Sequence, residues 1–466
     1  MKLENQVAIV TGAGSGIGRG IAVLFAREGA RIAVIGRTAR AQETVEITFV
    51  HIFPDERDIR RSTVEEIAAA FMAENPGVTV TIQTTTDDYG EVFEGALRAA
   101  DQGNAPHIVQ IEDSLTQIAI DSQYFVKIGD YATPEQLATI PDIIEPMRNF
   151  YNLDDEIWGL PWNASNPVMF INPTMFEAAG LDPASPPQTF DEITAACEAI
   201  MSAGIENLQG CINWPVNSWL PEQWLSMQNA LFVNNDNGRS ARATEAYIDT
   251  PEMARIFDWW NDLDDKGYFT YSGTPGAYTP EGLLFVTKKT VIHLTTSAAI
   301  SNIFSFAPIM GQFTPVVAPF PKPYAEATNG ITAGGAAVWV MAGHPEAETR
   351  AAVDFIFFLI NTENIKTWHK ASGYFPIRQS AIDELEAEGW FEENPAYFIP
   401  LRQLLDSTPN PANAGARLGA ASQVRTAVID AILSVIDNNE DPAAALAAAQ
   451  DRANKAIAEY NSVIGG

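Results

Sequence analysis

The sequence predicts a protein of the α/β class, because short apolar runs rich in β-branched residues alternate with segments of helical periodicity. The strand-like runs lie at residues 6–13, 45–51, 78–83 and 107–111. Such an order is typical of a mostly parallel sheet with helices on its faces. The chain length of 466 residues corresponds to two large domains or about three ordinary ones.

The charge balance restricts the partners of the protein. The chain has 28 Lys and Arg residues against 59 Asp and Glu residues, so its formal net charge is −31. Such a field repels nucleic-acid backbones and anionic lipid surfaces, and we expect no nucleic-acid partner. A small anion can still bind where positive groups and backbone N–H donors are placed locally. No apolar run of roughly 18 residues occurs, so no membrane-spanning helix is expected.

The first 44 residues open with a strand, a glycine-rich turn and a helix. The strand covers residues 6–13, the turn contains Gly12, Gly16 and Gly18, and a second strand is predicted at residues 31–35. Glycines in such a turn let the backbone approach a pyrophosphate group at the N-terminus of a helix. These three glycines are therefore the candidate cofactor-binding positions.

The run from Thr11 to Gly18 resembles the fingerprint that opens the short-chain dehydrogenase/reductase family, and Arg37 sits where that family selects the ribose substituent. The resemblance ends at about residue 44. No tyrosine of the chain is followed four residues later by lysine, so the acid/base pair of that family is missing. We therefore expect a vestigial, partial Rossmann-like β-α-β segment with no cofactor.

The remainder, residues 45–466, forms one coherent α/β pattern. Thr63 and Glu66 form a capping-box pattern, which predicts the start of a helix. Residues 78–83 alternate as a half-buried strand. Asp441 and Pro442 are an N-cap and first-turn pair, which predicts a C-terminal helix.

Several separated motifs in this remainder resemble the family 1 extracellular solute-binding proteins of ABC importers, and in particular those members that bind sn-glycerol 3-phosphate. The motifs lie at residues 159–167, 170–172, 176–181, 186–190, 334–341, 368–377 and 415–425. The resemblance implies a two-lobed periplasmic-binding-protein fold of type II, with a hinge that closes the lobes around the solute.

The resemblance also implies a division into lobes. Residues 1–44 are the truncated dinucleotide-binding-like segment. Residues 45–160 and 300–345 are assigned to lobe 1, and residues 161–299 and 346–466 to lobe 2.

The implied function is that of a non-enzymatic solute-binding component. It binds sn-glycerol 3-phosphate in the cleft between the lobes and delivers it to inner-membrane permease subunits, and we expect a monomer. A glycerophosphodiester or a sugar in the same cleft is the first alternative. An NAD(P)-dependent short-chain oxidoreductase is the alternative from another class.

A phosphate dianion in a closed cleft needs a bidentate guanidinium group together with hydroxyl and backbone donors. By resemblance the guanidinium belongs to Arg425, and Asp113 accepts from the glycerol hydroxyls, or Glu112 after a shift of one residue. Trp214 and Trp219 are further candidates, which would flank the glycerol carbons. The donors implied by resemblance are Tyr89, Ser165, Ser297, Gly335 and Tyr374.

Cysteine and histidine give few constraints. Cys197 and Cys211 are either two free thiols or one disulfide bridge. The five histidines show no metal-ligand spacing, so no metal site is expected.

The family resemblance implies a periplasmic location. The opening residues MKLENQ do not look like a signal peptide, so the chain as given is expected to stay in the cytoplasm. We interpret the N-terminus as chimeric, from a gene fusion or from a join made in assembly.

Overall fold

The computed structural model describes residues 2–3, 6–11, 16–35, 44–148, 150–153 and 156–464. Gly12, a predicted cofactor position, and Arg37 lie outside these residues.

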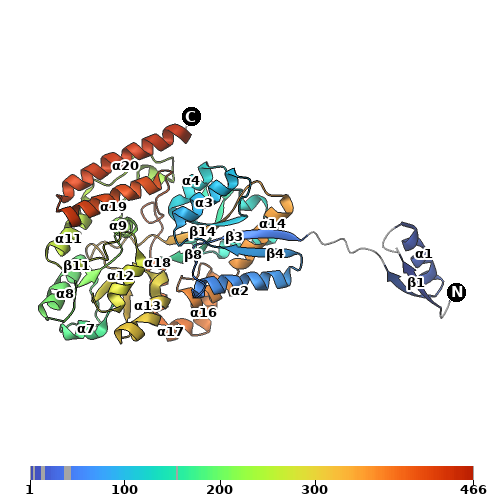
Figure 1. Cartoon of the computed structure of the whole chain (residues 1–466), viewed down its shortest axis with the longest axis horizontal. Coiled ribbons are helices and arrows are strands. Elements are labelled where there is room, and N and C mark those ends of the chain that lie inside the picture. Colours follow the sequence, from blue (N-terminus) through green and yellow to red (C-terminus); the bar gives the residue numbers. More distant parts are fainter. Residues whose placement is uncertain are drawn as a thin grey trace.

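The N-terminal segment is a small β-α-β unit, as predicted. Strands β1 (Val7–Thr11) and β2 (Arg31–Ile35) pair in parallel, and helix α1 (Gly16–Arg27) connects them. Its core is small, because it is built on Val10 and Ala22. Val7 and Ile9 are 70% and 65% exposed, so one face of the sheet has no cover. Figure 1 draws this unit apart from the main body.

The first lobe is built on a five-stranded sheet with strand order β4-β3-β5-β14-β8. The strands are β3 (Val45–Val50), β4 (Val78–Gln83), β5 (Ile108–Glu112), β8 (Gly159–Ser165) and β14 (Gly334–Val340). Strands β3, β4 and β5 run parallel, and β14 runs antiparallel to both β5 and β8. The parallel part confirms the expected strand–helix alternation.

Helices enclose this sheet, and most of the described core of the lobe is aliphatic and aromatic. They are α2 (Ile59–Glu74), α3 (Tyr89–Asp101), α4 (Thr116–Asp121), α5 (Pro134–Leu137), α6 (Glu145–Arg148), α14 (Glu346–Leu359), α15 (Thr362–Ser372), α16 (Gln379–Ala387) and α17 (Trp390–Glu393). A short ribbon pairs β6 (Asn152–Leu153) with β7 (Glu156–Ile157).

Helix α2 starts earlier than the sequence suggested. Asp58 is its N-cap and accepts a hydrogen bond from the backbone N–H of Arg60. The hydroxyl of Thr63, predicted to cap the helix, instead donates to the carbonyl of Ile59 inside the first turn. The capping-box prediction is therefore wrong in register, because Asp58, five residues before Thr63, caps the helix first.

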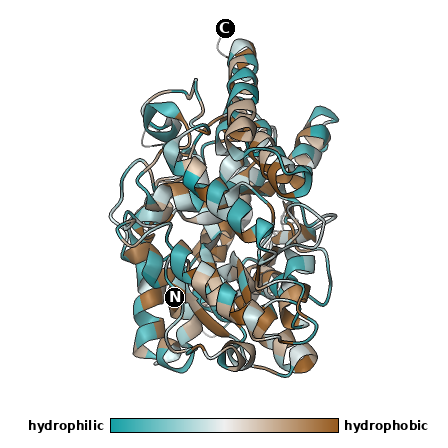
Figure 2. Ribbon diagram, turned by 90° about the vertical axis from the view of Figure 1, so that its left-hand side faces the viewer, coloured by the Kyte–Doolittle hydropathy of each residue, from teal (hydrophilic) through white to brown (hydrophobic). Residues whose placement is uncertain are grey.

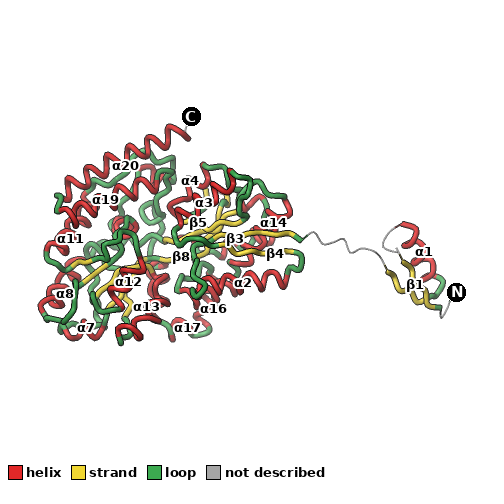
Figure 3. The backbone as a smooth tube through the Cα atoms, in the orientation of Figure 1, coloured by secondary structure: helices red, strands yellow, loops and turns green. Residues whose placement is uncertain are grey.

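The second lobe is built on another five-stranded sheet, with strand order β11-β10-β12-β9-β13. The strands are β9 (Pro167–Ile171), β10 (Ile212–Asn213), β11 (Phe269–Thr270), β12 (Ile292–Thr296) and β13 (Val316–Pro319). Figure 3 shows both sheets in yellow, each enclosed by red helices.

The helices of the second lobe follow the same principle. They are α7 (Pro173–Ala178), α8 (Phe190–Ser202), α9 (Trp219–Met227), α10 (Asn234–Gly238), α11 (Pro251–Asp265), α12 (Tyr278–Val286), α13 (Ile300–Phe306), α19 (Ala421–Asn438) and α20 (Pro442–Ile464). In Figure 2 the outer helices carry both hydrophilic and hydrophobic stretches, as expected for helices with one face on a core. The predicted C-terminal helix is α20, and Asp441 accepts from the backbone N–H of Ala444 in its first turn.

The chain crosses between the lobes more than once. Strand β8 ends at Ser165 in the first sheet and β9 begins at Pro167 in the second, so only Asn166 separates them. The amide of Asn166 donates to the carbonyl of Pro400, on α18 (Pro395–Leu405), which lies under this crossing. Each lobe is therefore discontinuous in sequence, and the two-lobed fold is confirmed.

The predicted lobe boundaries differ from the packing in two places. Residues 346–393, assigned to the second lobe, form α14 to α17 on the first, where Phe355 packs against Phe49. Residues 300–306 and 316–319, assigned to the first lobe, form α13 and β13 of the second lobe. The reason is the last crossing: β14 returns to the first sheet, and the helices that follow it cover that sheet.

A disulfide joins Cys197 on α8 to Cys211, which precedes β10. It closes a segment with a sequence separation of 14 residues within the second lobe. Of the two alternatives left open by the sequence, the structure has the bridge. Among the residues described, no helix is both long and apolar enough to cross a bilayer.

Candidate functional site

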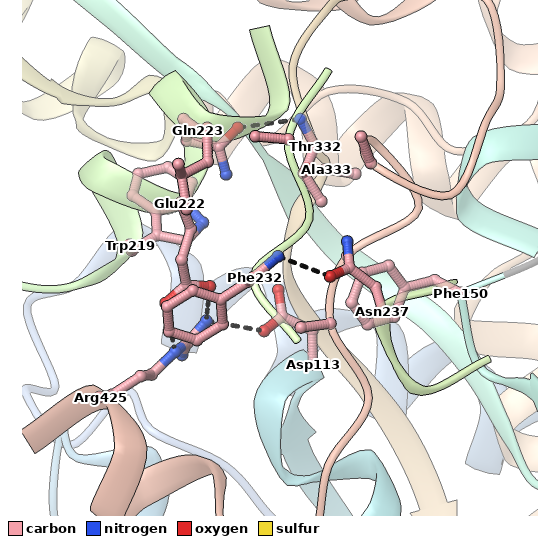
Figure 4. Close-up of a pocket in the computed structure, with 15 residues that line it drawn as sticks. Asp113, Phe150, Trp219, Glu222, Gln223, Phe232, Asn237, Thr332, Ala333 and Arg425 are labelled. Atoms are coloured by element: carbon pink, nitrogen blue, oxygen red, sulfur yellow. Dashed lines mark hydrogen bonds and ion pairs between the residues drawn. The ribbon is translucent and has the colours of Figure 1, made fainter. Parts of the chain in front are cut away.

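A pocket lies between the lobes, where the end of β5 faces α9 and α19 (Figure 4). The first lobe contributes Asp113 and Phe150 to its wall. The second lobe contributes Trp219, Glu222 and Arg425. The pocket therefore lies where a two-lobed binding protein encloses its solute.

Arg425 is the cation of this pocket. It projects from the first turns of α19, and its side chain is 18% exposed. Its Nε and Nη2 atoms donate to the two carboxylate oxygens of Glu222, both at 2.9 Å. Its Nη1 atom donates to Glu112 at 3.3 Å, across the gap between the lobes. Figure 4 shows the carboxylates of Glu222 and Asp113 directed toward the guanidinium group.

The charges around Arg425 shift its titration and that of Asp113. Burial lowers the pKa of Arg425, but Glu222, Glu112 and Asp113 outweigh it, and the pKa stays above its usual value. Burial, and then the nearby Glu112, raise the pKa of Asp113 to about 8. The raised pKa makes the protonated form of Asp113, which can donate a hydrogen bond, more accessible than in an exposed aspartate, whereas the predicted role was that of an acceptor.

A second guanidinium group shapes the pocket wall. Arg239 lies over the ring of Phe150 at 4.9 Å and donates to the carbonyl of Gly415 at 2.8 Å. Burial, and then the like charge of Arg417, lower the pKa of Arg239 to about 9. Gly415 is required here, because a Cβ atom on it would lie 2.3 Å from the Phe150 ring. Arg239 therefore fixes the wall formed by Phe150 and the segment around Gly415.

The predicted tyrosines form a second group, next to the pocket. The hydroxyl of Tyr89 accepts a hydrogen bond from Asn163 on β8 at 2.8 Å. Burial, and then the neighbouring Tyr374, raise the pKa of Tyr89. Tyr278, at the start of α12, is within electrostatic reach of Tyr374, Glu112 and Arg425, so it connects this group with the pocket.

The remaining predicted donors lie at the crossing between β8 and β9 and in the first sheet. Ser165 is buried on β8, and the Ser297 hydroxyl lies 3.4 Å from the backbone nitrogen of Asn166, which donates to it. Gly335 has φ +123°, and a Cβ atom there would lie 2.0 Å from the Asn163 carbonyl. None of these three lines the pocket around Arg425. Their predicted contact with a ligand remains a prediction.

The two predicted tryptophans lie in different parts of the second lobe. Trp219 lines the pocket and lies close to Gly334, where a Cβ atom would come within 2.7 Å of its ring nitrogen. Trp214 is fully buried in the core of the second lobe, against the rings of Trp259 and Trp224. Trp214 therefore does not flank the pocket as expected, because its ring packs against aromatic side chains of α9 and α11.

Sequence reasoning missed Glu222, the bidentate partner of Arg425. Its position was readable in part, because it lies three residues after Trp219 in the first turn of the same helix. Phe150 and Arg239 carried no comparable signal. Their place in the pocket depends on contacts between distant parts of the chain.

The pocket is closed in this conformation. Its free space for water is about 20 Å³, room for about one water molecule. Contacts between the lobes hold it, including the ion pair of Arg242 with Asp121 at 2.8 Å and the Tyr460 hydroxyl bonded to Asp121 at 2.9 Å. A solute with more than a few heavy atoms therefore enters only after the lobes open.

A cluster of His107, His344 and Glu348 lies on the first lobe, remote from the pocket in the fold. The backbone N–H of Thr48 donates to Nδ1 of His107, so Nε2 carries the proton and donates to Glu348 at 3.0 Å. His107 and Glu348 thus satisfy one another, and Nε2 of His344 lies 3.1 Å from the carbonyl of Pro106, its own hydrogen-bond partner. We do not assign them a metal.

Comparisons with known proteins identify the family. Residues 66–399 match the family of bacterial extracellular solute-binding proteins. Residues 6–84 match the short chain dehydrogenase family, which extends the N-terminal resemblance beyond residue 44, into β3 and β4 of the first lobe.

Relatives among curated proteins cover nearly the whole chain. The sn-glycerol-3-phosphate-binding periplasmic protein UgpB of Escherichia coli K12 is 26% identical over 424 residues, which is 90% of this chain and 94% of that protein. UgpB of Pectobacterium atrosepticum is 27% identical, over 91% of this chain and 94% of that protein.

Solved structures share the fold at lower identity. UgpB from Mycobacterium tuberculosis in complex with glycerophosphocholine has a TM-score of 0.74 and 18% identity, covering 89% of this chain and 99% of that chain. The GacH receptor of Streptomyces glaucescens has a TM-score of 0.73 and 16% identity, covering 89% and 98%. The chain belongs to the family of bacterial extracellular solute-binding proteins.

Proposed function

We propose that the protein is the solute-binding component of an ABC importer and that its ligand is sn-glycerol 3-phosphate. The observation that carries the proposal is the guanidinium group of Arg425 in the interlobe pocket, with its Nη1 edge directed at the other lobe. The curated relatives that bind this ester match over 91% of the chain and support the ligand.

The chemistry of the pocket suits a small phosphate ester. Arg425 supplies a planar cation, and a guanidinium group pairs with two phosphate oxygens. Glu112 and Asp113, at the end of β5, supply partners for hydroxyl groups. On ligand entry the phosphate takes the place of Glu112 at Nη1, and Glu112 is then free to accept from the glycerol.

A glycerophosphodiester is the second candidate, because the carboxylates limit the charge that the pocket accepts. Arg425 faces Glu222, Glu112 and Asp113 within 3.8 Å. A phosphomonoester brings about two negative charges and a diester only one, so the diester meets less repulsion. The fold neighbour from Mycobacterium tuberculosis was solved with glycerophosphocholine, a diester whose single phosphate charge is accompanied by the positive charge of choline.

The partners and location follow from the proposal. A solute-binding component of this kind releases its ligand to permease subunits of the inner membrane, and the curated relatives are periplasmic. The disulfide between Cys197 and Cys211 is of the kind that persists in an oxidising compartment.

A thermal-shift panel tests the proposal. The purified chain is heated with glycerol 3-phosphate, glycerophosphocholine, maltose or NADP at 1 mM each. We expect a rise in melting temperature with the phosphate esters, because a ligand that binds only the folded state stabilises it. A rise with maltose alone would contradict the proposed ester and identify a sugar as the ligand. A rise with NADP alone would favour the oxidoreductase.

A further inference from the structure

Glu222 holds one edge of the guanidinium group on which ligand binding is proposed to depend. Its two carboxylate oxygens accept from Nε and Nη2 of Arg425, both at 2.9 Å. The hydroxyl of Ser218 donates to the same carboxylate at 2.8 Å, and the Glu222 side chain is only 14% exposed. The pair is therefore both well oriented and largely desolvated.

The pair lies within one lobe, whereas the other contacts of Arg425 cross between lobes. Glu222 is on α9 and Arg425 on α19, both in the second lobe. Glu112 and Asp113 come from the first lobe, at 3.3 Å and 3.8 Å from the guanidinium group. Opening the lobes removes Glu112 and Asp113 from Arg425 and leaves Glu222 in place. Glu222 is thus the one carboxylate of the three that a ligand meets in both the open and the closed state.

A fixed negative charge beside the anion site acts on ligands in proportion to their charge. A dianionic phosphomonoester is repelled about twice as strongly as a monoanionic diester at the same place. The other charged and titratable groups that face the anion site beside Arg425 come from several elements. They are Arg425, Glu112, Asp113, Arg239, Tyr151 and Tyr278.

We infer that Glu222 is a specificity-determining residue, which lowers the affinity of the pocket for phosphomonoester dianions relative to phosphodiester monoanions. This inference rests on the proposed function, since it takes a phosphate ester as the ligand. Glu222 also positions Arg425, because it fixes the plane of the guanidinium group and leaves Nη1 directed toward the first lobe.

The size of the effect follows from one charge acting on another. For a Glu222 carboxylate about 6 Å from the ligand phosphate, with an effective dielectric constant near 20, one extra unit charge on the phosphate changes the dissociation constant by about 100-fold. Salt and residual water reduce this, so we expect about 10- to 100-fold.

Titration calorimetry at pH 7 measures the dissociation constants of glycerol 3-phosphate and of its methyl diester, which carries one negative charge and no positive group. The proteins are wild type, Glu222→Gln, Glu222→Asp and the control Glu459→Gln, which removes an exposed carboxylate on α20. In Glu222→Gln the ratio of the monoester constant to the diester constant should fall about 10- to 100-fold. Glu222→Asp keeps the charge. In this variant and in the control, the ratio of the two dissociation constants should stay within about threefold of the wild-type ratio.

A purely structural role for Glu222 predicts a different result, in which both ligands weaken equally and the ratio does not change. That result would overturn the inference. Glu222→Met, also uncharged and of similar length, keeps the test available if Glu222→Gln does not fold.

The same titrations at pH 5 give an independent readout. The second pKa of a phosphomonoester is about 6, so glycerol 3-phosphate then carries about one negative charge. The difference in ratio between wild type and Glu222→Gln should shrink to about threefold or less, and an undiminished difference would contradict the charge argument. Failure of the proposed function is distinct, because neither ester would then bind wild type at either pH.

Discussion

Replacing Arg425 by alanine removes the cation that contacts all three carboxylates of the pocket, and we expect two separate losses. Removing one partner of a largely buried ion pair costs about 3–5 kcal/mol of folding free energy, because the other charge stays buried without a partner. Here Glu222, whose side chain is 14% exposed, is that charge. Loss of the guanidinium group from the anion site costs about 2–5 kcal/mol of binding, on the order of 30-fold to several thousand-fold in affinity.

Arg425→Lys separates these two effects. Lysine keeps the positive charge, so most of the folding stability should remain, but its ammonium group cannot form two parallel bonds with a carboxylate or a phosphate. We expect an intermediate loss of affinity, about 10- to 100-fold. The matched control is Arg452→Ala, which removes an arginine that pairs with Asp430 at the surface of α20.

The assay is titration calorimetry with glycerol 3-phosphate, together with differential scanning fluorimetry of each variant. The reasoning is refuted if Arg425→Ala keeps its affinity within about twofold of wild type while remaining folded.

Four further changes have defined outcomes. Burial and the charge of Glu112 raise the pKa of Asp113 in the folded state above that of the unfolded carboxyl, so its contribution to stability falls as pH rises between the two pKa values, and Asp113→Asn should flatten this part of the pH profile of the melting temperature. Asp121→Asn removes the interlobe ion pair with Arg242, so small-angle scattering should show a more open ensemble and ligand affinity should fall about 3- to 10-fold; an unchanged ensemble would contradict this. Reduction of the Cys197–Cys211 bridge should destabilise the second lobe by about 3 kcal/mol, seen as a lower melting temperature with reductant and no such change in the double serine variant. Deletion of residues 1–43 should leave the melting temperature of the main body within about 1 °C, because the described contacts of that unit are internal.

Much of the fold could be predicted from local patterns. The alternating run at residues 78–83 became β4, and Asp441 with Pro442 began α20. These features depend on neighbours in sequence, so periodicity and capping chemistry describe them. The lobe boundaries were less accurate, since which sheet a helix covers is decided by a chain crossing and not by the helix itself.

The candidate site was predicted in part. Arg425 was expected from its surrounding motif, and it does lie in the interlobe pocket. Its partner Glu222 is 203 residues away in sequence, and no local pattern reports such a pair. Trp214 was expected at the ligand because it falls in the tryptophan-bearing loop of the resembled family, but large aromatic side chains also fill cores, and Trp214 is fully buried in one.

A crystal structure of the chain with glycerol 3-phosphate tests the central claim most directly. We predict the phosphate group against the Nη1 edge of Arg425, between the end of β5 and α19, with the glycerol hydroxyls toward Glu112 and Asp113. A phosphate group that makes no contact with Arg425, or an ester bound outside the interlobe pocket, would contradict the account.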